Sequence, residues 1–449
     1  MSDGRGTPDL AIRNGLVLPM VSGGEYFEGE VAIRDGRIHA VSEGPTDTLA
    51  ARVLDATGAA VLPGFIQGHV HVVQSLLRHQ ADGLELLDWL RLRTWPYEAS
   101  LDGDGVETAA ELGIVELLSG GTTTAVDFGT THHHDRVFRA AEGLGIRFVS
   151  GKTHMDVGDG APPVLLEDPD RSLAEAAELG HRWHGAAGGR LRYAVAPRFA
   201  LSCSSGLLSG CAELARANRW QLQSHAAENR DEIAEVRQRS GRGNIEFLDD
   251  HGLLGNDVIL AHGVHLDEAE VRRLADSGTT ICHCPGANLK LGSGIADVPA
   301  MLDAGVAVIL GADGPPCNNR LSIFHEMSLA ATIHGLRHGP AALDSWAILG
   351  MATRKAAEAL HMETEIGTLE EGKAGDVVVV ELDAWSALPG GDPASRIVFG
   401  GGPHMIRHVV VAGRPVVIDG QLVDVDTTDL RHRIDHAWKS TRRRMEEIA

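Results

Sequence analysis

Strand-like and helix-like segments alternate along the middle of this 449-residue chain, and their number limits the folds open to it. Short apolar runs alternate with amphipathic, helix-like stretches, a pattern typical of a parallel α/β fold. Eight is the number of strands that closes a barrel, so we predict a (β/α)8 barrel of the TIM type. The predicted strands are 61–66, 123–128, 147–151, 191–196, 220–224, 258–261, 279–282 and 306–311, and the predicted helices include 106–118, 171–183, 206–217, 230–250, 267–275 and 345–360.

Both ends of the chain have a different sequence pattern, which predicts short strands joined by tight turns. Asp35-Gly36 between two such strands is a strong hairpin signal. Neither end is long enough to bury a sheet alone, so we expect 1–62 and 365–449 to form one small β-sandwich beside a barrel domain of 63–364. Segment 430–448 is expected to be an Arg-rich surface helix, either solvated or at an oligomer contact. The predicted terminal strands are 10–18, 30–34, 38–41, 52–54, 376–382, 408–411 and 415–417.

The charge balance restricts the classes of partner that this chain can bind. A net charge of −22 and a pI near 5.4 leave no basic face for nucleic acid or an anionic membrane, which favours a small neutral or cationic substrate. Five cysteines without framework spacing suit a reducing compartment. Residues 1–9 lack the apolar stretch of a signal peptide, and eighteen apolar residues never run unbroken, so a cytoplasmic protein is expected. A homo-oligomer is also expected.

A His-x-His pair lies at the end of the first predicted barrel strand. Side chains alternate along a strand, so His69 and His71 leave the same face about 7 Å apart, a spacing suited to two ligands of one metal. With 23 histidines in the chain, a chance pair on a surface strand is the alternative. Three later strands, however, also end in residues that bind metals or transfer protons, namely His225, His262 and Asp313. Barrel enzymes place their active sites at these strand ends.

Glu228 follows His225 by three residues, at the turn into a predicted helix. Read alone, its carboxylate could simply cap that helix, because carboxylates favour helix N-termini. Beside the other strand-end residues, we interpret it as a catalytic group that faces a substrate nitrogen.

These motifs resemble the amidohydrolase superfamily, in particular its aminohydrolase branch of cytosine-, guanine- and adenosine-type deaminases and triazine hydrolases. The resemblance extends over nearly the whole chain and is more specific for the branch than for a substrate. It is carried by Pro63-Gly64-Phe65-Ile66-x-x-His69-x-His71, Gly120-Gly121-Thr122-Thr123-Thr124, Ala196-Pro197-Arg198-Phe199, His225-x-x-Glu228, Ala261-His262-Gly263, His283-Cys284-Pro285-Gly286-Ala287-Asn288-Leu289-Lys290, Gly311-Ala312-Asp313-Gly314 and the later run from Gly367 to Asp376.

The resemblance implies one divalent metal, zinc with iron as the alternative, bound by His69, His71, His225 and Asp313. Dinuclear relatives carry a carboxylated lysine at the end of strand four, and no lysine occurs there in this chain. The only lysine that puts a mononuclear site in question is Lys152, after strand three.

The same resemblance implies the chemistry. The metal would lower the pKa of a bound water toward neutrality. Asp313 would accept a proton from that water, His262 would orient the attacking oxygen, and Glu228 would protonate the ring nitrogen and then the leaving group.

Other residues near the predicted mouth are candidate substrate contacts. The resemblance to guanine deaminases suggests that Gln74 and Arg198 hydrogen-bond the base, with loop scaffolding as the alternative for Gln74. His283, Asn288 and Trp89 are candidate pocket residues, and Trp89 could equally be core. The run His132-His133-His134 is interpreted as a polar loop.

We therefore predict a hydrolytic deaminase of a purine-like or pterin-like amino-heterocycle that releases ammonia. The alternatives are a 5′-deoxyadenosine or S-adenosylhomocysteine type of nucleoside deaminase and an s-triazine chloro- or aminohydrolase. A ring-opening cyclic amidase is less favoured, because that branch more often has a bridged dinuclear site. A non-enzymatic barrel would have no reason to keep all five of His69, His71, His225, Glu228 and Asp313.

Overall fold

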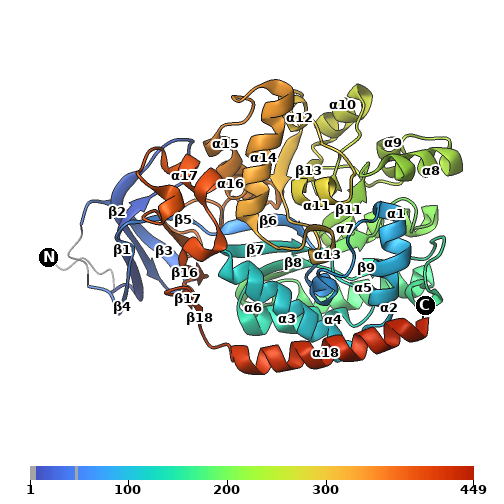
Figure 1. Cartoon of the computed structure of the whole chain (residues 1–449), viewed down its shortest axis with the longest axis horizontal. Coiled ribbons are helices and arrows are strands. Elements are labelled where there is room, and N and C mark those ends of the chain that lie inside the picture. Colours follow the sequence, from blue (N-terminus) through green and yellow to red (C-terminus); the bar gives the residue numbers. More distant parts are fainter. Residues whose placement is uncertain (1–6, 46–48, 449) are drawn as a thin grey trace.

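The computed structural model describes residues 7–45 and 49–448, and its larger part is a barrel of parallel strands surrounded by helices (Figure 1). Eight main strands follow in the order in which they occur in the chain, and a ninth short strand, β9, pairs with β10. An isolated bridge between Val70 and Asp313 joins the first strand to the end of the last and brings the barrel close to closure. The strands are β6 (Phe65–Val70), β7 (Thr122–Asp127), β8 (Arg147–Ser150), β9 (Thr153–His154), β10 (Leu191–Pro197), β11 (Gln221–Ala226), β12 (Val258–His262), β13 (Thr280–His283) and β14 (Ala307–Leu310).

Every residue of β6, β7 and β12 is buried, as expected for parallel strands with side chains inside the barrel and helices outside. Side-chain caps begin many of the helices; Asp102, Asp168 and Ser204 each accept a hydrogen bond from the first turn. The longer barrel helices are α3 (Gly103–Ser119), α4 (His134–Leu144), α5 (Pro169–Trp183), α7 (Ser205–Asn218), α8 (Arg230–Ser240), α9 (Asn244–Asp250), α10 (Glu268–Ser277), α14 (Ile323–His338), α15 (Ser345–Met351) and α16 (Arg354–Ala359).

Shorter helical turns fill the connections, and several of them lie at the mouth of the barrel. They are η1 (Val72–Leu77), α1 (Leu86–Trp89), the π-helix η2 (Leu90–Thr94), α2 (Trp95–Ala99), η3 (Pro163–Leu165), α6 (Ala186–Gly189), α11 (Pro285–Lys290), α12 (Val298–Asp303), α13 (Pro315–Asn318), η4 (Trp385–Ala387), α17 (Pro393–Gly400) and η5 (Pro403–Met405).

Three predicted elements are each two elements in the structure. The predicted strand 61–66 is divided at Gly64 into β5 (Ala59–Pro63), which belongs to the terminal sheet, and β6, which runs on through His69. The predicted helix 230–250 ends at Gly241, whose φ of 72° stops α8 before α9 begins. The predicted helix 345–360 is interrupted at Thr353, which has φ −139° and ψ −99°. The apolar pattern continues across the breaks at Gly64 and Thr353, so it did not reveal them. At the third break the signal was present, because residues 237–244 are polar or glycine and Gly241 ends α8.

The two ends of the chain, predicted to form one small β-sandwich, contribute their strands to a single sheet. Its order is β18-β17-β16-β15-β5-β1-β2-β3, with β4 paired to β1. Alternation along β15 divides its side chains between two cores, because Val377 and Val379 join the small core of this sheet while Val378 and Val380 join the barrel core. The strands are β1 (Leu10–Val17), β2 (Phe27–Arg34), β3 (Arg37–Glu43), β4 (Arg52–Asp55), β15 (Val377–Glu381), β16 (Ile406–Val411), β17 (Arg414–Ile418) and β18 (Gln421–Leu422).

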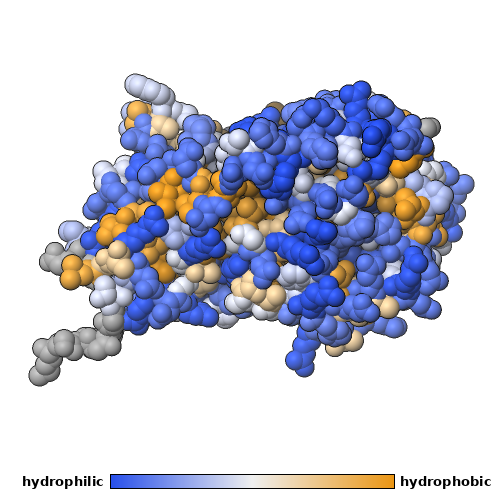
Figure 2. Space-filling view, turned by 90° about the horizontal axis from the view of Figure 1, so that it is seen from below, coloured by the Kyte–Doolittle hydropathy of each residue, from blue (hydrophilic) through white to orange (hydrophobic). Residues whose placement is uncertain are grey.

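The C-terminal helix α18 (Thr427–Ile448) crosses the lower side of the barrel (Figure 1). It is attached to α3 and its N-terminal cap through ion pairs, Arg433 with Glu111 and Arg444 with Asp102. Figure 2 shows this lower side, which is mostly hydrophilic over the barrel and has its main apolar area toward the end that carries the terminal sheet. Within residues 7–45 and 49–448, no helix is both long and apolar enough to cross a membrane.

Candidate active site

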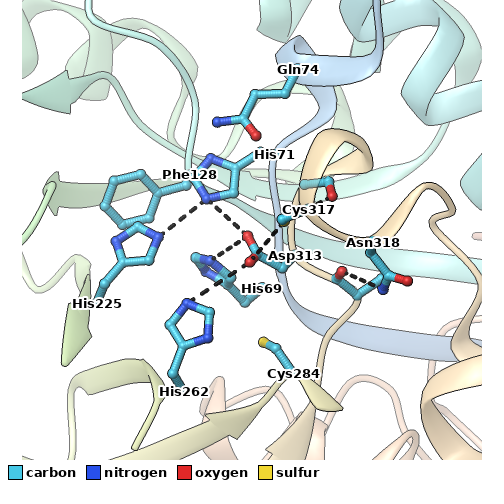
Figure 3. Close-up of polar contacts among 12 residues, drawn as sticks. His69, His71, Gln74, Phe128, His225, His262, Cys284, Asp313, Cys317 and Asn318 are labelled. Atoms are coloured by element: carbon cyan, nitrogen blue, oxygen red, sulfur yellow. Dashed lines mark hydrogen bonds and ion pairs between the residues drawn. The ribbon is translucent and has the colours of Figure 1, made fainter. Parts of the chain in front are cut away.

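Four potential metal ligands converge at the carboxyl ends of the barrel strands. One ligand atom from each of four side chains lies within 4.8 Å of the other three (Figure 3); these residues are His69, His71, His225 and Asp313. The Nε2 atoms of His71 and His225 are 3.2 Å apart, and Asp313 Oδ1 lies 3.5 Å from His69 Nε2 and 3.3 Å from His71 Nε2. The sequence-predicted ligand set is therefore brought together around one point.

Closure of the barrel explains how residues 244 positions apart in sequence become neighbours. The backbone N–H of Asp313 donates to the carbonyl of His69 over 3.0 Å, across the seam between β14 and β6. Asp313 has φ +61°, a left-handed conformation that is uncommon for a residue with a side chain. The last strand thus ends against the first, which directs the Asp313 carboxylate toward His69 and His71.

The protonation states of this cluster fit a cation. Nδ1 of His225 lies 2.6 Å from the carbonyl oxygen of Arg198, which can only accept, so Nδ1 carries the proton and Nε2 presents a lone pair. Burial holds the pKa of His225 and His71 well below the usual range, so both rings are neutral. Among the described residues, the buried Nε2 of His69 has no hydrogen-bond partner.

Asp313 supplies the negative charge of the cluster. Burial alone would raise its pKa, but the neighbouring imidazoles of His69, His262 and His71 hold the pKa well below the usual range. Three neutral imidazoles and one carboxylate are a donor set that suits zinc and related divalent metals. The residues present therefore fit the metal that the sequence predicts.

Glu228 and His262 lie next to the cluster without belonging to it. Glu228 Oε2 is 3.4 Å from His262 Nε2, which is also 3.9 Å from Asp313 Oδ2. Burial, reinforced by the charge of Asp313, raises the pKa of Glu228 well above its usual range, so its carboxyl can hold a proton. Nδ1 of His262 is 2.8 Å from Asn288 Oδ1, which fixes the ring. Glu228 does not cap α8, since Asn229 performs that function.

A cavity opens directly onto this group of residues. It contains about 430 Å³ of empty space, part of it open to solvent. Apolar side chains from α1, η2 and the loops form one wall. The cavity is lined by His71, Gln74, Leu86, Trp89, Leu90, Arg198, Phe199, His225, Glu228, Glu232, His262, Leu291 and Asp313.

Gln74 and Arg198 line the cavity but are joined to a residue that the sequence did not single out. The Arg198 guanidinium forms hydrogen bonds of 2.5 and 3.2 Å with the two carboxylate oxygens of Glu98, and Gln74 Nε2 donates to Glu98 Oε1 over 3.0 Å. All three side chains are buried. The predicted clamp on a substrate carbonyl therefore has its main donors directed at Glu98.

His283 and Asn288 do not line this cavity. Asn288 accepts from His262, and the buried ring of His283 lies beside His334, with ring centroids 5.3 Å apart. Both residues follow or end β13, as predicted, but neither lines the cavity. Trp89 does line the cavity, with 5% of its surface exposed.

Two further sequence candidates lie elsewhere. Lys152 is fully buried, and its Nζ is 2.7 Å from Glu167 and 2.8 Å from Glu175, so its charge is neutralised away from the four-ligand cluster. His132 lies within hydrogen-bonding distance of the Val164 carbonyl in η3, while His134 is buried at the start of α4 and contacts Ser150. The triplet is thus only partly the polar loop expected from the sequence.

Several neighbours of the cluster were missed because they show no motif. The Phe128 ring packs against three of the candidate ligand rings, 4.3 Å from that of His225. Cys317 Sγ donates to Asp313 Oδ2 over 3.1 Å. Asp127 is fully buried, and burial raises its pKa to about 6. An acidic residue at the end of a predicted strand was the available signal for Asp127, whereas Glu98 lies within a short helix and offers none.

The comparisons with known proteins agree with this geometry. Residues 60–416 match the model of the amidohydrolase family. The chain belongs to the amidohydrolase family. This amidohydrolase is 37% identical to the 5-methylthioadenosine/S-adenosylhomocysteine deaminase of Symbiobacterium thermophilum, across 95% of this chain and 98% of that protein.

Two solved structures place the fold in the same group. An adenosine deaminase from Xanthomonas campestris with bound zinc has a TM-score of 0.91 and 30% identity, covering 97% of this chain and 99% of that one. Atrazine chlorohydrolase from Arthrobacter aurescens, complexed with zinc, has a TM-score of 0.88 and 27% identity, covering 96% and 100%. The predicted barrel, the aminohydrolase branch and a hydrolase acting on carbon–nitrogen bonds are confirmed. The zinc in both structures and the cluster here support a divalent metal in this amidohydrolase.

Proposed function

We propose that this amidohydrolase is a zinc-dependent hydrolytic deaminase of an amino-substituted purine, and that its substrate is an adenine nucleoside modified at the 5′ position. The observation that carries the proposal is the position of Glu228. Its carboxyl is buried, has a raised pKa, and faces both the cavity and the residues around the four-ligand cluster. A protonated carboxyl in that place can deliver a proton to a ring nitrogen at neutral pH.

Deamination replaces an amino group on an aromatic carbon by oxygen, and the loss of aromaticity is the main barrier. When bound, zinc lowers the pKa of a coordinated water, which supplies a nucleophile at neutral pH. Glu228 protonates the ring nitrogen beside the attacked carbon, and this makes the carbon more electrophilic. His262, held by Asn288, orients the attacking oxygen, and Asp313 accepts its proton. That proton then passes to the amino group, the C–N bond breaks and ammonia leaves, while the added hydroxyl returns a proton to Glu228.

Two observations favour a nucleoside over a free base. The relative with 37% identity is named for two 5′-substituted adenosines, and it aligns with nearly the whole chain. In addition, Glu98 already binds the guanidinium of Arg198, so the clamp needed for a ring carbonyl is engaged before any substrate enters. Zinc is proposed over iron because both solved neighbours contain zinc.

An oxo-bearing, guanine-like base is the second candidate. It is favoured by the buried Gln74 Oε1, which has no hydrogen-bond partner within residues 7–45 and 49–448 although Gln74 lines the cavity. A free amide oxygen there could accept from a base edge. To bind such a base, Arg198 would have to give up part of its hydrogen bonding with Glu98 and donate to the substrate instead.

Ammonia release from the zinc-loaded protein distinguishes these possibilities. We expect turnover of 5′-methylthioadenosine, S-adenosylhomocysteine or 5′-deoxyadenosine, and little with guanine or pterins. Turnover restricted to guanine or pterins would replace the first candidate by the second. Release of chloride or alkylamine from triazines without any deamination would contradict both.

A further inference from the structure

Asp127 is a buried carboxylate that the proposed chemistry does not use. It ends β7, is fully buried, and accepts three hydrogen bonds. Oδ1 accepts from the backbone N–H of Val72 over 2.9 Å, and Oδ2 accepts from the backbone N–H of Gly129 over 2.9 Å and from Ser150 Oγ over 2.7 Å. Two of these donors belong to segments that form the candidate metal site.

The bond to Val72 acts next to a candidate ligand. Val72 directly follows His71, where the chain leaves β6 and turns into η1 with φ −127° and ψ 81° at His71. Because the N–H of Val72 is tied to Asp127, the peptide unit between His71 and Val72 has a fixed orientation. That orientation constrains the backbone at His71, from which the imidazole extends.

The bond to Gly129 acts on the wall behind the ligands. Phe128 lies between Asp127 and Gly129 in the chain, and its ring centroid is 4.3 Å from that of His225, 5.2 Å from His71 and 5.7 Å from His69. The Asp127 carboxylate thus closes a tight turn around Phe128. The same residue therefore constrains one ligand directly and all three imidazoles through their common neighbour.

We propose that Asp127 is a positioning residue for the metal centre, whose carboxylate holds the peptide after His71 and the ring of Phe128 in place. The inference rests on the proposed metal site. A carboxylate is required because both backbone partners are N–H donors, and an asparagine amide in either orientation would direct an N–H at one of them. Groups that orient metal ligands in this way typically change metal affinity by 10- to 100-fold when they are altered.

The test is the zinc dissociation constant, measured by competition with a chromophoric chelator on chelator-stripped protein. We expect Asp127→Asn to weaken zinc binding by roughly 10- to 100-fold. The matched control is Ser150→Ala, which removes one of the three donors, keeps both backbone bonds, and should bind zinc almost as tightly as the parent. Far-UV circular dichroism and unfolding of the metal-free proteins check that the variants remain folded.

Tight zinc binding by a folded Asp127→Asn, equal to that of the parent, would overturn the inference. Failure of the parent itself to bind zinc would instead contradict the proposed function. If Asp127→Asn does not fold, Val72→Pro gives the same test, because it removes the Val72 N–H at the first position of a helix, where proline is well tolerated. Weakened zinc binding by this variant supports the inference, and unchanged binding overturns it.

Discussion

At the scale of single residues, the carboxyl of Glu228 is the group whose removal separates proton transfer from metal binding. It lies outside the four-ligand cluster but within 3.4 Å of His262. Glu228→Gln should keep the metal content of the parent while kcat falls by a factor of roughly 10² to 10⁴, the usual contribution of general acid–base catalysis. Elemental analysis and steady-state ammonia release provide the two readouts. Turnover near the parental rate would show that the proton takes another path.

The buried Glu98–Arg198 pair gives a second prediction at this scale. Arg198→Met leaves Glu98 buried without its cation, and breaking such a pair costs about 3–5 kcal/mol. We expect a clear loss of thermal stability in Arg198→Met. The matched control is the double variant with Glu98→Gln, which removes the unpaired charge and should recover much of the loss. Equal melting temperatures of the single variant and the parent would show that the pair does not stabilise the fold.

Glu326 predicts a dependence of stability on pH. This buried carboxyl accepts from the Gly286 N–H and from Asn318, and burial raises its pKa from 4.5 to about 7. The folded state thus binds the proton more tightly than the unfolded state, so this contribution to stability is full below pH 4.5 and is lost as pH rises through 7. Its size is on the order of 3 kcal/mol.

The variant Glu326→Gln lacks this titration. Its stability should therefore improve relative to the parent as pH rises from 5 to 8, whatever the constant difference between the two proteins. Urea unfolding of both proteins, at matched metal content, gives the difference between their free energies of unfolding at each pH, which is the gap followed here. A gap that stays the same from pH 5 to 8 would show that Glu326 does not titrate in this range.

At the scale of elements, the break at Gly64 separates β5 from β6, the strand that carries His69 and leads into His71. A methyl group on Gly64 would lie 2.1 Å from Thr123 Oγ1 on β7, so Gly64→Ala should destabilise the fold by about 1–3 kcal/mol. Gly143→Ala is the control, because its site near the end of α4 is open and the exchange should stabilise by roughly 0.5–1 kcal/mol. Thermal unfolding of the two variants should shift in opposite directions. A Gly64→Ala protein as stable as the parent would contradict the close packing at this break.

The same region shows which features of the structure the sequence could predict and which it could not. Apolar residues run from Val61 to Ile66 on both sides of the break, so periodicity predicted a strand in the right place but joined two sheets into one element. The candidate ligands were predictable because each lies at or just after the end of a strand, and these ends meet at the barrel mouth. The ion pair between Glu98 and Arg198 was not predictable, because a contact between residues 100 positions apart leaves no local pattern in the sequence.

At the scale of the whole molecule, the terminal sheet and the barrel are joined by a buried ion pair. Arg147 of β8 binds both carboxylate oxygens of Asp376, just before β15, over 2.9 and 3.1 Å. Alternate valines of β15 also enter the barrel core. The terminal sheet and the barrel therefore share a packed boundary, and the division of the chain into two domains stays a prediction. A homo-oligomer and a cytoplasmic location stay predictions.

At the barrel mouth, we propose, one divalent metal held by four side chains supports hydrolytic deamination. The most direct test titrates chelator-stripped protein with zinc and follows ammonia release from a 5′-modified adenosine. We expect activity that is absent without metal, rises linearly, and saturates at one zinc per chain, with His69→Ala losing most of its metal. Full activity without metal, or saturation only at two zinc ions per chain, would contradict this proposal.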